Sequence, residues 1–126
     1  KKTELEWQNL RLLQMDIENM DFEDNSFDCV VCTFVFCTVP DPIQGLREVK
    51  RVLKPGGKAI FLEHMKSRYR VINVFLWIMN LFSTILLGTS MLRETQKSIE
   101  ETGFQIEAIE NHLFDIIRLI VVRKVI

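Results

Sequence analysis

The sequence predicts an α/β fold with parallel strand pairing, and three consecutive segments support this prediction. Residues 27–36 form a continuous apolar and β-branched run, which is typical of a central strand covered on both faces. Residues 41–53 place apolar side chains at helical spacing and predict an amphipathic helix. Residues 58–64 form a second apolar run. Because strands that alternate with helices usually pair in parallel, we expect these two strands to be parallel neighbours.

The segment before residue 27 has weaker patterns. Residues 9–15, NLRLLQM, are interpreted as a short strand that ends at Asp16. Residues 18–26 are acidic and rich in turn-forming side chains, so they predict an exposed loop. The whole chain, residues 1–126, is taken as one domain because its length suits a single core.

Capping residues define the ends of the first predicted helix. Asp41 is a favourable N-cap, Pro42 suits the first helical position, and Gln44 is spaced as the partner in a capping box. Pro55 disfavours a helical residue before it, and the two glycines after it allow a tight reversal at positive φ. Because these glycines follow a helix rather than a strand, they predict a turn and not a nucleotide-binding loop.

A second helix and two further strands complete the predicted elements. The helical pattern begins near residues 92–94 and ends at Gly103. The apolar segments 104–111 and 116–126 then supply two more strands.

Residues 71–88 interrupt this alternation with an almost wholly apolar segment. As a helix it would span roughly 27 Å at about 1.5 Å per residue, the short limit for crossing a bilayer. Its polar side chains fall within one half of a helical wheel, which favours a helix on a membrane surface or a lid over an apolar ligand, with an ordinary core helix and a transmembrane span as the alternatives. We interpret residues 66–91 as an insertion that forms either a lid or a membrane-surface helix. The polar side chains are Asn73, Asn80, Ser83 and Thr84.

Composition limits the classes of function. The net charge of -1 does not indicate a nucleic-acid partner. Cys29 and Cys32 form a C-x-x-C pattern inside a predicted strand, where residues three apart point to opposite faces. Since no second Cys or His pair completes a tetrahedral site, we predict reduced thiols and no metal. No signal-peptide pattern is visible, so we expect a cytoplasmic protein, either free or attached to a membrane surface.

Residues 15–57, MDIENMDFEDNSFDCVVCTFVFCTVPDPIQGLREVKRVLKPGG, resemble the second half of a class I S-adenosylmethionine-dependent methyltransferase. Within this class the chain is similar to the ubiquinone and menaquinone biosynthesis enzymes. It is more similar to the membrane-associated methyltransferase-like proteins that methylate small thiols, through VVCTFVFCTV, FLEHM and LRET. The resemblance implies a Rossmann-like fold with a mostly parallel sheet and an antiparallel final strand.

The resemblance also implies S-adenosylmethionine as the cofactor and assigns residues to it. Asp16 would accept a hydrogen bond from the adenine amino group, and the backbone of Ile17 would meet the ring edge. The backbone of Cys32, Thr33 and Phe34 would flank the methionine part, because ligands of open α/β sheets bind outside the carboxyl ends of the strands.

Two further residues are candidates for catalysis. Glu63 and His64 end the second predicted strand at the same edge of the sheet. Either side chain could face a substrate or act as a general base.

One family element is absent from the sequence. The family's cofactor loop is a glycine-rich turn after its first strand, with an acidic residue further on. No G-x-G pattern precedes Asp16, and the residues before it are too few for two strands and two helices. Relative to the family sheet order of 3-2-1-4-5-7-6, we therefore expect an N-terminally truncated chain with an incomplete cofactor pocket.

The leading hypothesis is thus S-adenosylmethionine-dependent methyl transfer to a small apolar or thiol acceptor, incomplete in this chain. The first alternative is a non-catalytic binding or regulatory module, which could form a homodimer through an unpaired strand edge or contact a membrane through residues 71–88. The second is an unrelated doubly wound nucleotide-binding domain.

Overall fold

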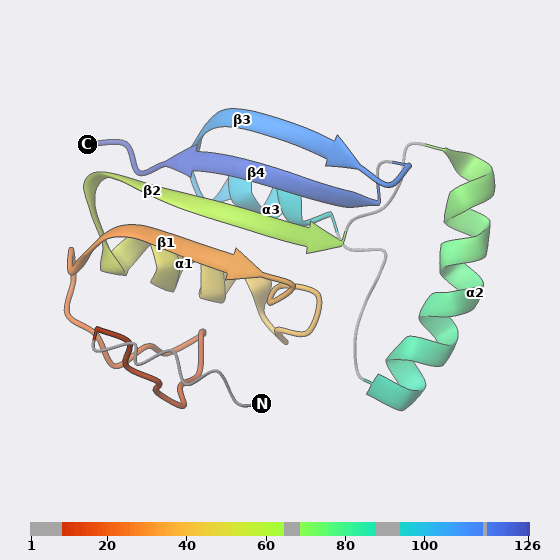
Figure 1. Ribbon diagram of the computed structural model, residues 1–126, viewed down its shortest axis with the longest axis horizontal. Coiled ribbons are helices and arrows are strands. Elements are labelled where there is room, and N and C mark those ends of the chain that lie inside the picture. The colour runs from red at the N-terminus through yellow and green to blue at the C-terminus, as the bar shows by residue number, and fades with distance from the viewer. Residues whose placement is uncertain (1–8, 65–68, 88–93, 115) are drawn as a thin grey trace, which may run out of the picture.

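The computed structural model describes residues 9–64, 69–87, 94–114 and 116–126, which form four strands and three helices (Figure 1). In chain order these are β1 (Phe27–Thr33), α1 (Pro42–Val52), β2 (Leu53–His64), α2 (Arg70–Leu87), α3 (Thr95–Glu101), β3 (Gln105–His112) and β4 (Ile117–Arg123).

The four strands form one sheet in the order β1-β2-β4-β3. β1 pairs with β2 in parallel, whereas β4 lies antiparallel between β2 and β3. The predicted α/β fold with an antiparallel final strand is therefore confirmed. The order also matches the last four strands, 4-5-7-6, of the family order given above.

The core lies between one face of this sheet and the helices α1 and α3 (Figure 1). At its centre Phe61 of β2 is fully buried, and its ring lies 5.7 Å from that of Phe36 and 6.3 Å from that of Phe104, in edge-to-face geometry. Leu46 and Val49 of α1 are buried in the same cluster. The apolar stripe of the predicted amphipathic helix is thus the surface that α1 buries.

The opposite face of the sheet is more open than the sequence pattern predicts. Val31 of β1 is 64% exposed, and its cross-strand neighbour Ile60 is only partly buried. The prediction of a central strand covered on both faces is wrong for the described residues, because β1 is an edge strand there. Cys29 is exposed and Cys32 is buried, which confirms that they point to opposite faces.

The segment before β1 also differs from its prediction. Residues 10–15 form no strand, because no described strand lies beside them to supply hydrogen bonds. Leu12 is 85% exposed, so the apolar residues of this segment are not a buried face. A turn and an isolated bridge between Asp16 and Asn19 follow.

The N-cap of α1 is Asp41, as predicted, but the second residue of the capping arrangement is not the predicted one. Asp41 accepts a hydrogen bond from the backbone N–H of Gln44 at 3.0 Å, and Pro42 is the first helical residue. The capping-box role of Gln44 is wrong, because its side chain donates to the carbonyl of Glu18 instead. The carboxylate of Glu18 accepts the N–H of Asp41 at 2.8 Å and takes that role from a distant part of the chain.

The predicted turn at Gly56 and Gly57 is instead an irregular stretch near the amino end of β2, where the register with β1 shifts between the pairs Phe27–Leu53 and Cys29–Lys58 (Figure 1). Gly56 adopts φ of +76°, whereas Gly57 does not have positive φ. Gly57 is required for a different reason, since a Cβ there would lie 2.8 Å from the carbonyl oxygen of Lys54. Only Gly56 therefore uses the positive φ that glycine allows, and Gly57 permits a close backbone approach.

The later elements follow the sequence pattern closely. α3 begins at Thr95, and the predicted helix start at residues 92–93 lies outside the described residues. Gly103 adopts φ of +75° directly after the helix. Residues 66–68 and 88–91 of the predicted insertion also lie outside the described residues, which include all of α2 (70–87).

The acidic loop before β1 is fixed to α1 by one arginine. Arg51 donates to both carboxylate oxygens of Glu48, to Asp24, and to the carbonyl oxygens of Met20 and Phe22, at 2.7–2.9 Å. Glu48 in turn accepts the N–H of Met20 at 2.8 Å. The hydrogen bond from Arg51 holds the pKa of the Glu48 carboxyl below its ordinary value of 4.5.

We expect Arg51→Ala to lower the melting temperature by about 5 °C, because it leaves Glu48 without its cation and the loop carbonyls without a donor. A carboxyl group whose pKa is lowered by folding stabilises the protein above its unfolded pKa, and this contribution disappears as the pH falls. The difference between wild type and variant should therefore be full at neutral pH and shrink below pH 4.5.

Arg47→Ala is the matched control, because Arg47 lies on the exposed side of the same helix. Thermal unfolding followed by circular dichroism from neutral to acid pH measures both variants. An Arg51→Ala difference that stays constant at acid pH would contradict the role of the Glu48 pair.

Candidate functional site

The predicted cofactor and catalytic residues of the sheet meet where β1 and β2 end together. Parallel pairing aligns Cys32 with Phe61 and Thr33 with Leu62. The N–H of Phe34 donates to the carbonyl of Leu62 at 2.8 Å, and Phe34 then adopts φ of +53° and turns the chain out of the sheet. An aromatic residue in the left-handed region is uncommon and marks a constrained turn.

Glu63 lies beneath this turn and is fully buried. Its Oε1 accepts the backbone N–H of Val35 at 3.1 Å and that of Phe36 at 3.3 Å. Its Oε2 is buried and has no hydrogen-bond partner among the described residues. Burial raises the pKa of Glu63 to about 7, although the backbone hydrogen bonds lower it in part. The carboxyl group therefore faces protein backbone rather than an open cavity.

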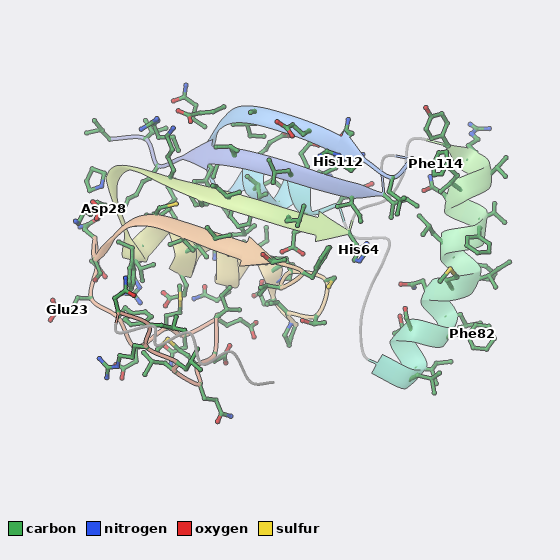
Figure 2. The ribbon with its side chains drawn as sticks, viewed as in Figure 1. Glu23, Asp28, His64, Phe82, His112 and Phe114 are labelled. Carbon is green, nitrogen blue, oxygen red and sulfur yellow. The ribbon has the colours of Figure 1, made fainter. Side chains whose placement is uncertain are left out.

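His64 is the last residue of β2 and lies at the same edge (Figure 2). Its ring stacks on that of Phe34, with ring centroids 4.6 Å apart and 27° between the planes. Its Nδ1 is buried and has no hydrogen-bond partner in the part of the chain that the structure describes. Desolvation lowers the pKa of His64 below 6.5, so the imidazole is neutral at pH 7.

Cys32 and Thr33 differ in the direction of their side chains. Cys32 is buried in the core, and burial together with the charge of Glu63 raises the pKa of its thiol to about 12. Thr33 is exposed on the open face of the sheet. The Cys32 side chain therefore belongs to the core, whereas that of Thr33 faces the open side of the sheet.

Asp16 and Ile17 precede the acidic loop rather than ending a strand. Asp16 is exposed, and its Oδ1 accepts the N–H of Glu18 at 2.9 Å. Ile17 is partly buried and packs against the core near Gly45 of α1. Glu18 then contacts the N-terminus of α1 through Asp41. Residues 16–18 are therefore held against the N-terminus of α1.

An open hollow of about 510 Å³ lies between the start of α2 and the turn that joins β3 to β4. This turn is at the end of the sheet where β2 ends, since His64 pairs with Ile117. Phe114 at that turn is 71% exposed, and Figure 2 shows it beside α2. His112, to which no role is assigned, is exposed at the end of β3. The hollow is lined by Tyr69, Arg70, Val71, Ile72 and Phe114.

Sequence reasoning placed Glu63 and His64 at the correct edge but missed how they differ. Glu63 faces the backbone of the turn, whereas His64 faces the ring of Phe34. The alternation of side chains along a strand was the available signal, because adjacent residues must point to opposite faces. The left-handed conformation of Phe34 could not be predicted from the sequence, because the position holds neither glycine nor asparagine, the residues that usually adopt it.

Comparison with known proteins finds similarity to methyltransferases. A methyltransferase-domain family model matches residues 1–61. The chain is 45% identical over 91 residues to thiol S-methyltransferase TMT1B of Rattus norvegicus, covering 69% of this chain and 37% of that protein. It is 33% identical over 88 residues to the ubiquinone/menaquinone biosynthesis C-methyltransferase UbiE of Hahella chejuensis, covering 70% of this chain and 35% of that protein.

Solved structures agree with the fold. A SAM-dependent methyltransferase from Methanosarcina mazei superposes with a TM-score of 0.65 at 18% identity, covering 89% of this chain and 66% of that one. The chain spans only 35–37% of the length of the two curated relatives. The sequence similarities and the shared fold together show that the chain belongs to the class I S-adenosylmethionine-dependent methyltransferases.

Proposed function

We propose that the protein containing this chain transfers a methyl group from S-adenosylmethionine to the thiol of a small apolar acceptor. The observation that carries the proposal is His64, a desolvated neutral imidazole at the carboxyl end of β2, stacked on Phe34. Such a group can remove the proton of a thiol, whose thiolate is the reactive form. The similarity to a thiol S-methyltransferase supports this acceptor class.

The residues at this edge would hold the cofactor in the way the family resemblance implies. S-adenosylmethionine, when bound, supplies a methyl group that its sulfonium makes electrophilic. Asp16 would hold the adenine amino group, since its carboxylate is exposed and Oδ1 already accepts the N–H of Glu18. The backbone of residues 32–34 would flank the methionine part at the turn after β1.

His64 acts on the acceptor in this proposal. Its imidazole would accept the thiol proton, which would leave the acceptor as a thiolate, the form that reacts with the electrophilic methyl group that S-adenosylmethionine would supply. Phe34 holds the imidazole ring by stacking at 4.6 Å and excludes water from one of its faces. The apolar lining of the neighbouring hollow suits an apolar acceptor.

Asp16→Ala tests the cofactor assignment in the intact protein. We expect about tenfold weaker binding of S-adenosylmethionine by calorimetry, because a hydrogen bond to a charged acceptor is lost. Asp21→Ala is the matched control, since Asp21 is an exposed acid in the same loop. Equal losses for both variants would contradict the assignment, and absence of binding to the wild-type protein would favour the non-catalytic alternative.

His64→Ala tests the proposed base. We expect roughly a hundredfold slower methylation of an alkane thiol at neutral pH, with the affinity for S-adenosylmethionine unchanged. The loss should be much smaller for an aromatic thiol of low pKa, because that thiol ionises without a base. His112→Ala is the control, since His112 is exposed at the end of β3. An equal loss for both thiols would show that His64 does not remove the proton.

We also propose that α2 rests on a lipid surface. Among the described residues, no helix has the length and apolarity needed to cross a membrane. α2 is amphipathic with its apolar side outward, because Ile78, Phe82 and Ile85 are 47%, 62% and 73% exposed whereas Asn73 and Asn80 are partly buried. The helix contains no acidic residue and begins at Arg70, which suits anionic headgroups.

Charge substitutions on the two sides of α2 test this proposal. Ile78→Glu places a charge on the outward apolar side and should lower binding to vesicles that contain anionic lipid by about tenfold. Thr84→Glu places the same charge on the polar stripe and serves as the control. Co-sedimentation measures both, and equal partition of Ile78→Glu, Thr84→Glu and wild type would contradict contact through this side.

A further inference from the structure

The turn of residues 34–38 obtains its hydrogen bonds from two sources. Within the turn, Thr38 donates to the carbonyl of Val35 through its N–H at 3.1 Å and its hydroxyl at 2.9 Å, and the thiol of Cys37 donates to the carbonyl of Phe34 at 3.4 Å. The N–H groups of Val35 and Phe36 instead donate to Glu63, which belongs to the next strand. The carbonyl groups of Phe34 and Val35 thus accept hydrogen bonds from within the turn, whereas the N–H groups of Val35 and Phe36 both donate to one carboxylate outside it.

The conformation that Glu63 supports is an unfavourable one for the chain alone. Phe34 adopts φ of +53°, which bulky residues avoid unless their surroundings impose it. The same turn places the ring of Phe34 over His64, while Phe36 on its other side is fully buried in the core. A carboxylate that draws both N–H groups inward therefore fixes the backbone on either side of the strained residue.

We propose that Glu63 is a positioning residue, whose ionised carboxylate holds the 34–38 turn, and with it the ring of Phe34 over His64, in the conformation that receives the cofactor. The receiving role of the turn rests on the proposed function, whereas the anchoring itself does not. Protonation removes the charge from the acceptor of two N–H groups, and the turn then loosens. Glu63 acts through the turn and does not take a proton from the acceptor.

The carboxylate of Glu63 accepts no hydrogen bond from a cationic side chain among the described residues. Cys32 of β1 is a buried thiol whose own pKa is raised in part by the charge of Glu63. Arg118 of β4 lies opposite Glu63 across the strand pair, but its guanidinium donates to Gln96 of α3 at 3.0 Å. His64 is neutral at pH 7. Backbone N–H groups are therefore what favours the ionised form, and burial opposes it.

Nuclear magnetic resonance of the ligand-free intact protein tests the anchor directly. The amide signals of Val35 and Phe36 should shift with a common midpoint near pH 7. Glu63→Gln keeps an oxygen acceptor of the same shape and should abolish the titration, whereas His64→Ala should retain it. Amides that do not titrate, or that titrate equally in Glu63→Gln, would overturn the anchor.

The affinity for S-adenosylhomocysteine then tests what the anchor is for. In the wild-type protein the affinity should rise by about threefold or more as Glu63 ionises, and in Glu63→Gln it should not depend on pH in this range. Titrating amides with a pH-independent affinity would overturn the link to the cofactor while leaving the anchor intact. Absence of binding at every pH, with titrating amides, would contradict the proposed function instead.

Discussion

Parallel pairing of β1 with β2 is the constraint on which the rest of this structure depends. It aligns Thr33 with Leu62 and makes both strands end at one edge of the sheet. A parallel pair needs a crossover, which α1 supplies on the face where Leu46 and Val49 are buried. The turn after β1 and the last two residues of β2 are thereby adjacent, although Phe36 and Glu63 lie 27 positions apart in the sequence and Phe34 and His64 lie 30 apart.

Glu48 and Glu63 are both buried, but their surroundings shift their pKa values in opposite directions. Glu48 has a cation, Arg51, and its pKa is lowered, so it remains ionised and fixes the acidic loop to α1. Glu63 has only backbone N–H donors, and burial raises its pKa to about 7. The first arrangement is a permanent structural contact. The second changes its charge near neutral pH, which suits a group that adjusts a binding turn.

The elements with strong periodicity could be predicted from the sequence. The apolar spacing and the cap at Asp41 gave α1 correctly, and side-chain alternation separated Cys29 from Cys32. Residues 9–15 were misinterpreted, because a strand needs a neighbour and local pattern cannot show whether one is present. The role of Glu18 at the helix cap was invisible for a similar reason, since its partner lies more than twenty residues away.

In the candidate site too, the features set by local pattern could be predicted from the sequence, and those set by contacts between distant residues could not. Its place at the ends of two strands follows from topology, which the alternation of strand and helix predicts. The opposite directions of the Glu63 and His64 side chains follow from alternation along β2. The left-handed conformation of Phe34 follows from neither, because its contacts, and those of Val35 and Phe36, are with residues of another strand.

Exposed apolar side chains gather at this edge, where they cost free energy unless something covers them. Leu113 and Phe114 are 63% and 71% exposed and both have positive φ, so the turn between β3 and β4 combines exposure with backbone strain. The side of α2 that faces away from the sheet, which includes Phe82, adds a further exposed apolar surface (Figure 2). A lipid surface in contact with this side of α2 would cover these apolar side chains. The proposed surface contact therefore accounts for apolar area that the described residues leave exposed.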